Sequence, residues 1–546
     1  MDLDALRSAA AAWIADDPDP ATRAELAGVV DGLPATAADL ADRLAGPLRF
    51  GTAGLRGPVR AGPNGMNLAV VRAAARGLVT HLEASGARGP LVIGYDARLG
   101  SAEFAAETAR VCTGAGRRAL LLPRRLPTPV LAYAVRRLGA AAGVMVTASH
   151  NPPADNGYKV YLADGAQLAP PHDAEIETAI RAVGPLADVP LGEPGEVLGE
   201  DLVRAYVADI AALADPDSPR DLTVAYTALH GVGGDVAAQV FERAGFEVPV
   251  PVGAQQEPDA AFPTVAFPNP EEPGAMDLVR ALAATTGADL AVAHDPDADR
   301  CAVAVPDPAL GEPGDPAAWR ILTGDETGIL LADHLLGRGV RGTVATTIVS
   351  SSMLRALAGA YGVPYAETLT GFKWIARAAD DLAYGYEEAL GYAVAPRLVR
   401  DKDGISAALL VAELAATLKT RGSSLLGRLD ALAAEHGVHA TAPLTVRVTD
   451  PGVIAAAMAR LRADAPGTLL GRPVALTEPA PDVVGLRGDG VRVVVRPSGT
   501  EPKLKAYLEV VVPVAGPDGV PAARADAAGL LDRLRREMST TLGLNG

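Results

Sequence analysis

Short β-type runs that alternate with alanine-rich helical stretches are the feature that most restricts the fold of this chain. The runs are LVIGY (91–95), RALLL (118–122), AAGVMV (141–146), LTVAY (222–226), DLAVAH (289–294) and TVATTIV (343–349). Because parallel strands need a crossover connection, usually a helix, this alternation predicts mostly parallel sheets with helices on both faces. Ligands of such sheets bind beyond the carboxyl ends of the strands, so the residues that follow these runs are the first site candidates.

The length and the two ends of the chain predict several domains. The chain has 546 residues, which predicts three or four domains at roughly 150 residues each. Residues 2–45 are expected to form two Ala/Leu helices separated by a turn at 18–20. After about residue 440, the runs TAPLTVRV, VRVVV and LKAYLEVVV predict strands with few helices between them, and hence a smaller α+β domain.

The charge and the apolar pattern exclude several classes of protein. With 49 basic and 66 acidic residues the net charge is −17, which argues against nucleic acid or an anionic membrane as the main partner. Two cysteines give no disulfide framework. The start MDLDALRSAA lacks the features of a secretory signal, and we find no uncharged apolar run of about 18 residues. We therefore expect a soluble cytoplasmic protein, whose oligomeric state the sequence leaves open.

A serine-containing loop follows the run AAGVMV. The order is Thr147-Ala-Ser149-His150-Asn-Pro, and Lys159 follows in DNGYKVY. A hydroxyl beside an imidazole, on a loop braced by prolines, is typical of a nucleophile presented to a cleft. The alternative is an ordinary turn in which Ser149 bonds to its own backbone. These residues alone leave both interpretations open.

Asp295, Asp297 and Asp299 follow the run DLAVAH at every second position, next to Arg300. Three carboxylates with this spacing can converge on one hard cation, and Mg²⁺ leaves room beside its oxygen ligands for a phosphate oxygen and water. An EF-hand is excluded, because its sixth and twelfth positions need Gly and Glu, where this chain has Arg300 and Pro306. A solvated acidic turn is the remaining alternative.

Four further segments carry donors suited to a phosphorylated sugar. In RPSGTEPK (496–503), an arginine fork, two hydroxyls and a glycine-opened backbone can bind a phosphate dianion, although a plain hairpin turn is the alternative. In TGFK (370–373), GYEEALGY (385–392) and RDKDG (400–404), carboxylates can accept sugar hydroxyls and an ammonium can hold a phosphate. Singly, these are more often loop charges than ligands.

The ordered set of motifs resembles one known family. FGTAGLRG, TASHNP, DNGYKVY, LHGVGG, DPDADR, ETLTGFKW, GYEEALGY, DKDG and RPSGTEP are similar to motifs of the α-D-phosphohexomutase superfamily, above all its branch of phosphoglucomutases and phosphopentomutases. The resemblance implies an α/β protein with four domains around a central cleft, three related α/β domains with mixed sheets and a C-terminal α+β domain. We place these domains at residues 1–205, 206–320, 321–440 and 441–546.

The resemblance also implies a role for each candidate residue. Ser149 would be the phosphoserine, and it would bind Mg²⁺ together with Asp295, Asp297 and Asp299. The polar set around the reacting hydroxyl would be Arg56, His150 and Lys159, any of which fits as the general base. Residues expected to contact the phosphoserine, the sugar or its distal phosphate are Arg300, Thr370, Gly371, Lys373, Glu387, Glu388, Lys402, Arg496, Ser498, Gly499, Thr500 and Lys503.

The implied function is that of a phosphohexomutase. It would move a phosphoryl group between C1 and C6 of an aldohexose phosphate through a sugar 1,6-bisphosphate, with glucose 1-phosphate as the leading substrate. Phosphomannomutase, phosphopentomutase and a non-catalytic sugar-phosphate-binding protein are the alternatives. Many relatives read G-E-x-S in the sugar loop, whereas this chain has Ala389 at the serine position, so the preferred sugar stays open. The expected partners are small sugar phosphates, with no nucleic acid and no membrane.

Overall fold

The computed structural model describes residues 2–49, 54–448, 451–497 and 503–543. Its chain divides into two compact units. Unit 1 comprises Met1–Leu322 and Gly391–Ala416, and unit 2 comprises Thr323–Leu390 and Thr417–Gly546. Among the described helices, none is both long enough and apolar enough to cross a bilayer.

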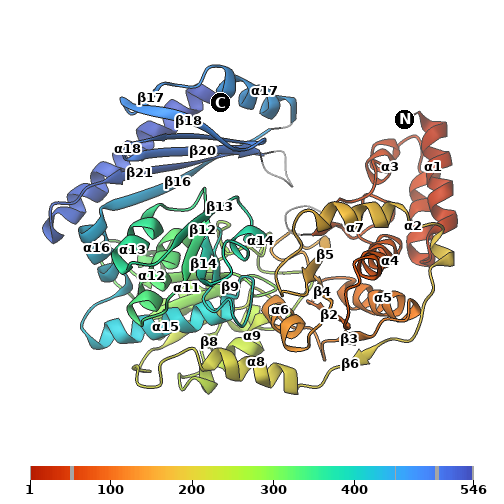
Figure 1. The fold of residues 1–546 in the computed structure, drawn as a ribbon, viewed down its shortest axis with the longest axis horizontal. Coiled ribbons are helices and arrows are strands. Elements are labelled where there is room, and N and C mark those ends of the chain that lie inside the picture. Colours follow the sequence, from red (N-terminus) through yellow and green to blue (C-terminus); the bar gives the residue numbers. More distant parts are fainter. Residues whose placement is uncertain (1, 50–53, 449–450, 498–502, 544–546) are drawn as a thin grey trace. The chain divides into compact units, whose positions relative to one another are not determined.

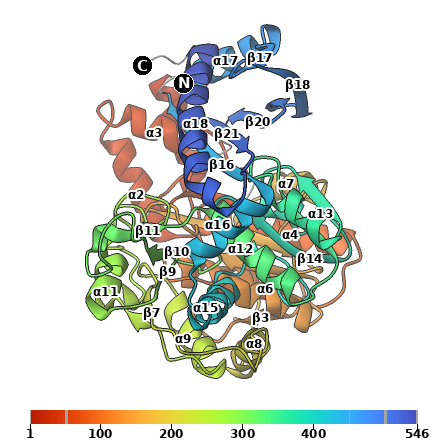
Figure 2. The ribbon, with the colours of Figure 1, turned by 90° about the vertical axis from the view of Figure 1, so that its left-hand side faces the viewer.

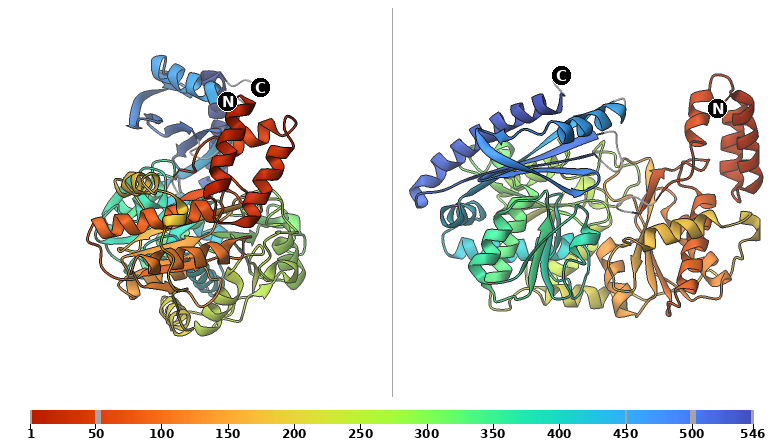
Figure 3. Two further views of the ribbon diagram at one scale, coloured as in Figure 1. Left: turned by 90° about the vertical axis from the view of Figure 1, so that its right-hand side faces the viewer. Right: turned by 45° about the horizontal axis from the view of Figure 1, so that its top comes forward.

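The N-terminal segment of unit 1 forms three helices, where the sequence predicted two. They are α1 (Leu3–Asp16), α2 (Pro20–Asp31) and α3 (Ala37–Arg43), drawn in red in Figure 3. The prediction failed beyond α2, because Gly32 and Pro34 end that helix and a short third helix follows. Leu6, Leu26 and Leu40 give each helix a buried residue in one shared core.

The first sheet of unit 1 is mixed. Its order is β1-β5-β4-β2-β3-β6, with β4, β2, β3 and β6 parallel and β5 antiparallel to both β4 and β1. Helices cover both faces (Figure 1). The elements are β1 (Leu55–Pro58), α4 (Leu68–Ala84), β2 (Leu91–Tyr95), α5 (Ser101–Gly114), β3 (Ala119–Leu121), α6 (Thr128–Arg137), β4 (Ala142–Val146), β5 (Asp155–Leu162), α7 (His172–Arg181), a 3₁₀ turn (Leu186–Asp188), β6 (Glu196–Val197) and α8 (Asp201–Ala211).

The second sheet of unit 1 repeats this plan. Its order is β11-β10-β9-β7-β8, in which β9, β7 and β8 are parallel and β10 is antiparallel to β9. In both sheets a buried parallel strand therefore turns into an antiparallel neighbour, through residues 147–154 and 295–300. The elements are β7 (Val224–Thr227), α9 (Gly233–Arg243), β8 (Val250–Pro251), α10 (Gly253–Gln256), α11 (Asp277–Thr286), β9 (Leu290–His294), β10 (Cys301–Pro306), a 3₁₀ turn (Pro316–Ala318) and β11 (Trp319–Ile321).

The third sheet, in unit 2, contains three parallel strands in the order β13-β12-β14. Its elements are α12 (Gly324–Gly337), β12 (Thr343–Thr347), α13 (Met353–Tyr361), β13 (Tyr365–Thr368), α14 (Phe372–Ile375) and β14 (Leu382–Glu387). The chain then contributes β15 (Gly391–Ala393) and the first part of α15 (Gly404–Thr420) to unit 1, and it continues in unit 2 with α16 (Leu425–His436).

The C-terminal part of unit 2 is an α+β domain, as predicted. Its six strands have the order β16-β21-β20-β19-β18-β17 and are antiparallel throughout. Helices α17 and α18 pack on one core with this sheet, and Figure 2 shows α18 beside β16 and β21. The elements are β16 (Val438–Arg447), α17 (Pro451–Ala463), β17 (Thr468–Leu469), β18 (Arg472–Ala480), β19 (Val483–Gly488), β20 (Val491–Pro497), β21 (Lys503–Val512), a 3₁₀ turn (Pro517–Gly519) and α18 (Val520–Leu542).

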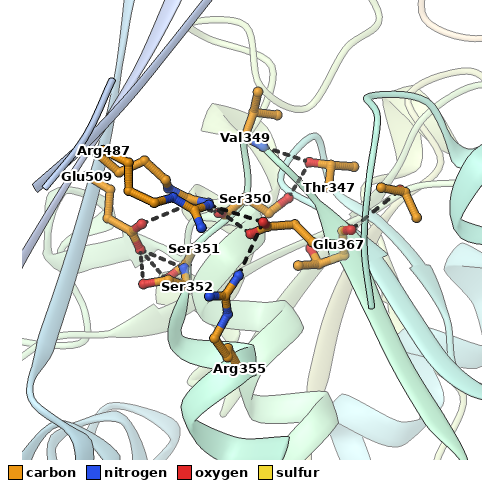
Figure 4. Close-up of polar contacts among 12 residues, drawn as sticks. Thr347, Val349, Ser350, Ser351, Ser352, Arg355, Glu367, Arg487 and Glu509 are labelled. Atoms are coloured by element: carbon orange, nitrogen blue, oxygen red, sulfur yellow. Dashed lines mark hydrogen bonds and ion pairs between the residues drawn. The ribbon is translucent and has the colours of Figure 1, made fainter. Parts of the chain in front are cut away.

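A polar cluster joins the third sheet to the C-terminal sheet inside unit 2 (Figure 4). Glu509 on β21 accepts hydrogen bonds from the N–H of Ser352 at 2.6 Å and from its Oγ at 3.0 Å. Arg492 on β20 lies 2.7 Å from Glu509 and 3.1 Å from Glu367 on β13. Burial would raise the pKa of Glu509, but His439 and Arg492 hold it at about 2. The cluster is therefore an ionised, buried attachment between the two sheets.

We expect Glu509→Gln to destabilise unit 2, because it leaves the buried charge of Arg492 without its closest partner. Breaking a buried ion pair costs about 3–5 kcal/mol. Calorimetry should therefore show a lower unfolding temperature for unit 2. In the parent, the contribution of Glu509 is complete above its ordinary pKa and is lost as the pH falls toward 2, so the variant should lose this acid dependence. Glu435→Gln, at an exposed pair, is the control and should change little. If Glu509→Gln and Glu435→Gln unfold at the same temperature, Glu509 does not stabilise unit 2 through its buried ion pair.

Candidate active site

Ser149 lies in the loop between β4 and β5 and is only 2% exposed. Its Oγ donates a hydrogen bond of 2.6 Å to Oδ2 of Asp295 and lies 3.1 Å from Nδ1 of His150. The backbone at Ser149 has a φ of +53°, a left-handed conformation that few residues other than glycine adopt. Strain of this kind persists only where the surroundings fix it, and it is typical of functional loops.

Arg98 fixes the backbone of the serine loop. Its Nη1 donates to the carbonyls of Pro152 and Asp155 at 2.8 and 3.0 Å, and its Nη2 donates to those of Ser149 and Asn151 at 2.6 and 2.7 Å. The residue is only 4% exposed. One planar cation thus binds three carbonyls of the serine loop and the carbonyl of Asp155 at the start of β5, which explains how the strained serine is held.

Asp96 and Thr147 complete the support beneath Ser149. The N–H of Ser149 donates to Oγ1 of Thr147 at 2.8 Å, and that hydroxyl donates to Oδ2 of Asp96 at 2.6 Å. The same carboxylate lies 3.5 Å from Nε of Arg98. A buried chain of hydrogen bonds therefore runs from Asp96, the residue after β2, to the candidate nucleophile.

The three aspartates lie in the loop from β9 to β10, where each is at most 1% exposed. Thr128 at the start of α6 holds the middle one, because its N–H donates to the carbonyl of Asp297 at 2.9 Å and its Oγ1 to Oδ2 at 2.6 Å. A β-carbon at Gly231 would lie 2.3 Å from Cα of Pro296. The turn of the LHGVGG motif therefore packs directly against the aspartate loop, and only glycine fits there.

Two lysines neutralise this group of carboxylates. Nζ of Lys159, on β5, lies 2.6 Å from Oδ2 of Asp297 and 3.0 Å from Oδ2 of Asp299. Nζ of Lys402 lies 3.3 Å from the same oxygen of Asp299 and 3.5 Å from Asp401. Burial would raise the pKa of Asp299, but the two lysines and Arg300 hold it well below its ordinary value.

The aspartates fit a hard divalent cation. Their ligand atoms lie within 4.8 Å of one another. Oδ1 of Asp297 and Oδ1 of Asp299 are buried, with no hydrogen-bond partner in the described part of the chain. Burial and the other two carboxylates raise the pKa of Asp295 well above its ordinary value. Unpartnered carboxylate oxygens that converge in this way are the donor set such a cation needs.

His150 and Arg56 lie beside the same loop. Nη1 of Arg56, on β1, donates to Oδ1 of Asn151 at 3.1 Å. Burial, together with the charges of Arg300 and Arg56, holds the pKa of His150 well below its ordinary value, so this imidazole is neutral at pH 7. The N–H of Arg300 donates to Oδ1 of Asp295 at 3.0 Å. Of the residues predicted from the sequence, the structure of unit 1 thus brings together Ser149, His150, Arg56, Lys159, Lys402, Arg300 and the three aspartates.

The predicted sugar-binding residues lie in unit 2, beyond the carboxyl ends of its parallel strands. Thr370 and Gly371 follow β13, Lys373 is in α14, Glu387 ends β14 and Glu388 follows it. Because β13, β12 and β14 are parallel neighbours, these loops share one edge of the sheet. Oγ1 of Thr370 is buried without a hydrogen-bond partner among the described residues.

Glu388 is the predicted sugar residue with the most unusual environment. Its Oε2 accepts hydrogen bonds from Oγ of Ser350 at 3.0 Å and from Oγ1 of Thr347 at 3.2 Å. Burial, together with Glu387 and Asp325, raises the pKa of Glu388 to about 7. This carboxyl therefore changes its charge near neutral pH.

The predicted phosphate loop lies partly outside the described residues. Arg496 on β20 pairs with Lys505 on β21, and Lys503 begins β21. Ser498, Gly499 and Thr500 fall between the described ranges 451–497 and 503–543. The phosphate-binding role of this hairpin stays a prediction.

Sequence reasoning missed Asp96, Arg98 and Thr128, as well as the hydroxyls of Thr347 and Ser350. Asp96 and Arg98 directly follow the run LVIGY, so the rule that selects the carboxyl ends of strands pointed to them as well. Thr128 gave no such signal, because it begins α6 and its partner Asp297 lies in the β9–β10 loop, 169 residues further along the chain.

Comparison with known proteins gives the family. Models of the phosphoglucomutase/phosphomannomutase family match in order: alpha/beta/alpha domain I over residues 47–185, domain II over 204–311, domain III over 323–436 and the C-terminal domain over 444–516. A probable phosphomannomutase of Haemophilus influenzae is 44% identical over 459 residues, which cover 82% of this chain and 93% of that protein. The chain belongs to the phosphoglucomutase/phosphomannomutase family, within the α-D-phosphohexomutase superfamily.

Further relatives agree with this assignment. A mouse phosphopentomutase is 35% identical over 474 residues, or 79% of this chain and 74% of that protein. The solved structure of parafusin, a phosphoglucomutase from Paramecium, has a TM-score of 0.70 at 20% identity and covers 91% of this chain and 96% of its own, which shows a shared fold. As a member of this family the chain is a mutase, an intramolecular phosphotransferase of the isomerase class.

We expect Arg98→Lys to slow turnover strongly, because an ammonium cannot bind all four carbonyls, three in the serine loop and one at Asp155, at once. A small displacement of a reacting group can cost roughly 100-fold in rate. Steady-state kinetics with a sugar 1-phosphate should show this loss in kcat, with KM changed much less.

Arg117→Lys is the matched control. Arg117 also donates to two backbone carbonyls, those of Gly89 and Ala87, but away from the serine loop. It should leave kcat within a few-fold of the parent. An equal loss in both variants, or no loss in Arg98→Lys, would show that Arg98 does not position the serine.

Proposed function

We propose that this mutase moves a phosphoryl group between C1 and C6 of an aldohexose phosphate, chiefly converting glucose 1-phosphate into glucose 6-phosphate. A phosphoserine at Ser149 and a sugar 1,6-bisphosphate would be the intermediates. The observation that carries the proposal is the buried contact of Ser149 Oγ with Asp295, beside carboxylate oxygens that have no partner among the described residues. A cation bound there would adjoin the serine oxygen that carries the phosphoryl group.

The proposed chemistry is a reversible transfer between two oxygens. The free hydroxyl of the sugar monophosphate attacks the phosphorus on Ser149, the new O–P bond forms and the bond to Oγ breaks. The proton that the sugar hydroxyl loses is passed to Oγ of Ser149, which leaves as a hydroxyl group, so that bonds and charges balance. The bisphosphate then turns, and Ser149 attacks its other phosphorus by the same step in reverse. Such transfers need positioning and charge neutralisation more than covalent help.

The charge states of the nearby groups indicate where the proton goes. Burial would lower the pKa of Lys159, but Asp297 and Asp299 raise it, so Lys159 is an ammonium at neutral pH. Arg56 is a guanidinium. His150 is neutral, and its Nδ1 lies 3.1 Å from Oγ of Ser149. Of the three candidates from the sequence, His150 is thus the group best able to exchange a proton with the serine.

The remaining residues would bind and orient. Asp295, Asp297 and Asp299, with a phosphate oxygen on Ser149, would hold Mg²⁺, which would supply charge neutralisation at the phosphoryl oxygens. Arg56, Arg300 and Lys159 would add positive charge there. Residues proposed to bind the sugar or its distal phosphate are Thr370, Gly371, Lys373, Glu387, Glu388, Lys402, Arg496, Ser498, Gly499, Thr500 and Lys503.

Mannose 1-phosphate is the second candidate substrate, because a relative at 44% identity is named a probable phosphomannomutase. A pentose phosphate is the third, since other relatives are named phosphoribomutase and phosphopentomutase. A mouse relative at 34% identity is named a glucose 1,6-bisphosphate synthase, which supports glucose bisphosphate as an activator. Glucose and mannose differ only at C2, and one hydroxyl contact there is worth about 1–3 kcal/mol.

We expect the purified chain to carry a phosphate on Ser149 and to lose turnover in Ser149→Ala. Phosphopeptide mapping after incubation with glucose 1,6-bisphosphate should locate the phosphate. Turnover of glucose, mannose and ribose 1-phosphates, each with a trace of its bisphosphate, should rank glucose first.

Two outcomes would contradict these proposals separately. If no sugar turns over faster in the parent than in Ser149→Ala, the serine is not the phosphoryl carrier. If mannose or ribose 1-phosphate has the highest kcat/KM, Ser149 is still supported as the phosphoryl carrier, but glucose 1-phosphate is not the preferred substrate. In the same assay, His150→Gln should slow phosphorylation of Ser149 by the bisphosphate without loss of sugar binding.

We expect kcat/KM to fall below neutral pH as Glu388 takes up a proton. The folded-state pKa of Glu388 is raised to about 7, so the carboxyl is neutral below that pH and accepts sugar hydroxyls less strongly. Between about pH 8 and pH 6 this loss amounts to about tenfold. A pH profile of kcat/KM measures it.

Glu388→Gln is the control for this profile. The second ionisation of the substrate phosphate, with a pKa of about 6, affects the pH profile of kcat/KM equally in the parent and in the variant. The fall in kcat/KM near pH 7 that is caused by Glu388 should therefore be missing only in the variant. The kcat/KM of the variant should also be lower than that of the parent at pH 8. Profiles of the same shape would exclude Glu388 as the titrating group.

A further inference from the structure

We propose that His81, His172 and Glu175 form a second metal site, which binds Zn²⁺ or a similar borderline cation between α4 and α7 of unit 1. His81 is in the last turn of α4, His172 begins α7 and Glu175 follows one turn later. Side chains three positions apart share one face of a helix, so His172 and Glu175 point the same way. The three ligand atoms lie within 4.8 Å of one another.

The distances within the cluster suit a tetrahedral ion. Zinc binds imidazole nitrogen and carboxylate oxygen at about 2.0–2.2 Å, which places tetrahedral ligand atoms roughly 3.4 Å apart. Oε2 of Glu175 lies 3.2 Å from Nδ1 of His172 and 3.7 Å from Nδ1 of His81. The cluster therefore has close to the required spacing.

The two helices hold the ligands in place. A β-carbon at Gly77 of α4 would lie 2.4 Å from Cγ1 of Ile180 in α7, so the helices are in close contact there. The side chain of His81 is 10% exposed, whereas those of His172 and Glu175 are 43% and 51% exposed. The site is thus anchored on one side, and its exposed side leaves a fourth position for water.

An ordinary ion pair between a histidine and Glu175 is the alternative. An ion pair needs only one histidine, whereas Oε2 of Glu175 lies 3.7 Å from Nδ1 of His81 and 3.2 Å from Nδ1 of His172. A neutral imidazole is the form that binds a metal. The histidine rings are 5.4 Å apart at an angle of 66°, which orients them edge to face beside one carboxylate.

The donor set separates this site from the aspartate triad. Two imidazoles and one carboxylate favour zinc or another late transition metal, whereas three carboxylates favour Mg²⁺. A bound ion would clamp α7 onto α4. Since α7 follows β5, which carries Lys159, the clamp would stabilise the part of unit 1 that holds the site. The inference does not depend on the proposed sugar substrate.

The test is calorimetric titration of Zn²⁺ into the full chain in buffer with excess Mg²⁺, so that the aspartates are already saturated. The parent should bind one Zn²⁺ tightly. His172→Ala and Glu175→Gln each remove one ligand at an exposed position, so they should fold normally. Their affinity should fall by more than the roughly 10–100-fold lost when only a supporting residue of a metal site is removed.

His436→Ala is the matched control, because His436 also lies next to a glutamate, 3.8 Å from Glu435, but belongs to no group of three possible metal ligands in the described part of the chain. It should bind Zn²⁺ like the parent. Co²⁺ gives a second readout, since the strong visible absorption of four-coordinate Co²⁺ should appear in the parent and vanish in His172→Ala. Equal Zn²⁺ affinity in the parent and His172→Ala, or no tight binding in the parent, would overturn the proposal.

Discussion

Three carboxylates buried side by side impose the constraint on which the rest of unit 1 depends. Two like charges about 4 Å apart repel by about 4 kcal/mol even where the effective dielectric constant is moderate, and Asp295, Asp297 and Asp299 are all buried. The fold meets this cost with ammonium groups from two distant segments, Lys159 on β5 and Lys402 after β15. The aspartate loop therefore requires the first sheet, the second sheet and the segment 391–416 to be assembled together.

That requirement explains why residues 391–416 belong to unit 1, although they follow the third sheet in the chain. The N–H of Gly404 donates to the carbonyl of Ala298 at 3.2 Å, and a β-carbon at Gly404 would lie 2.3 Å from the carbonyl oxygen of Arg300. The hydroxyl of Tyr161 donates to Asp401 at 2.7 Å. The DKDG motif is thus held against the aspartate loop by the close approach of Gly404, and against β5 by a buried hydrogen bond from Tyr161. These contacts place residues 391–416 in unit 1 and not with the third sheet that precedes them in the chain.

The regular part of the fold could be predicted from the sequence, because it follows from local periodicity. The runs at 91–95 and 343–349 gave β2 and β12, and the strand ends identified Ser149 and the aspartates. Contacts between distant segments left no such trace. Arg98 shows the difference: its place after β2 was readable, but its bonds to the serine loop and to Asp155 depend on how the loop folds. The raised pKa of Glu388 was missed for the same reason, since it depends on packing. The third N-terminal helix was missed although Gly32 and Pro34, the residues that end α2, stand in the sequence.

The use of the two basic residue types follows from the geometry they serve. The chain has six lysines among its 49 basic residues, and two of the six lie at the aspartates. Arg98 spreads its N–H groups over four carbonyls, which needs a planar fork. Lys159 places a point charge between two carboxylates. Its contacts, and the side-chain contacts of Lys402 with Asp299 and of Thr128 with Asp297, all fall on Oδ2. The donors of the protein thus occupy one oxygen of Asp297 and of Asp299 and leave Oδ1 without a partner among the described residues. This division lets the same carboxylates be neutralised within the fold and still offer oxygens to a cation.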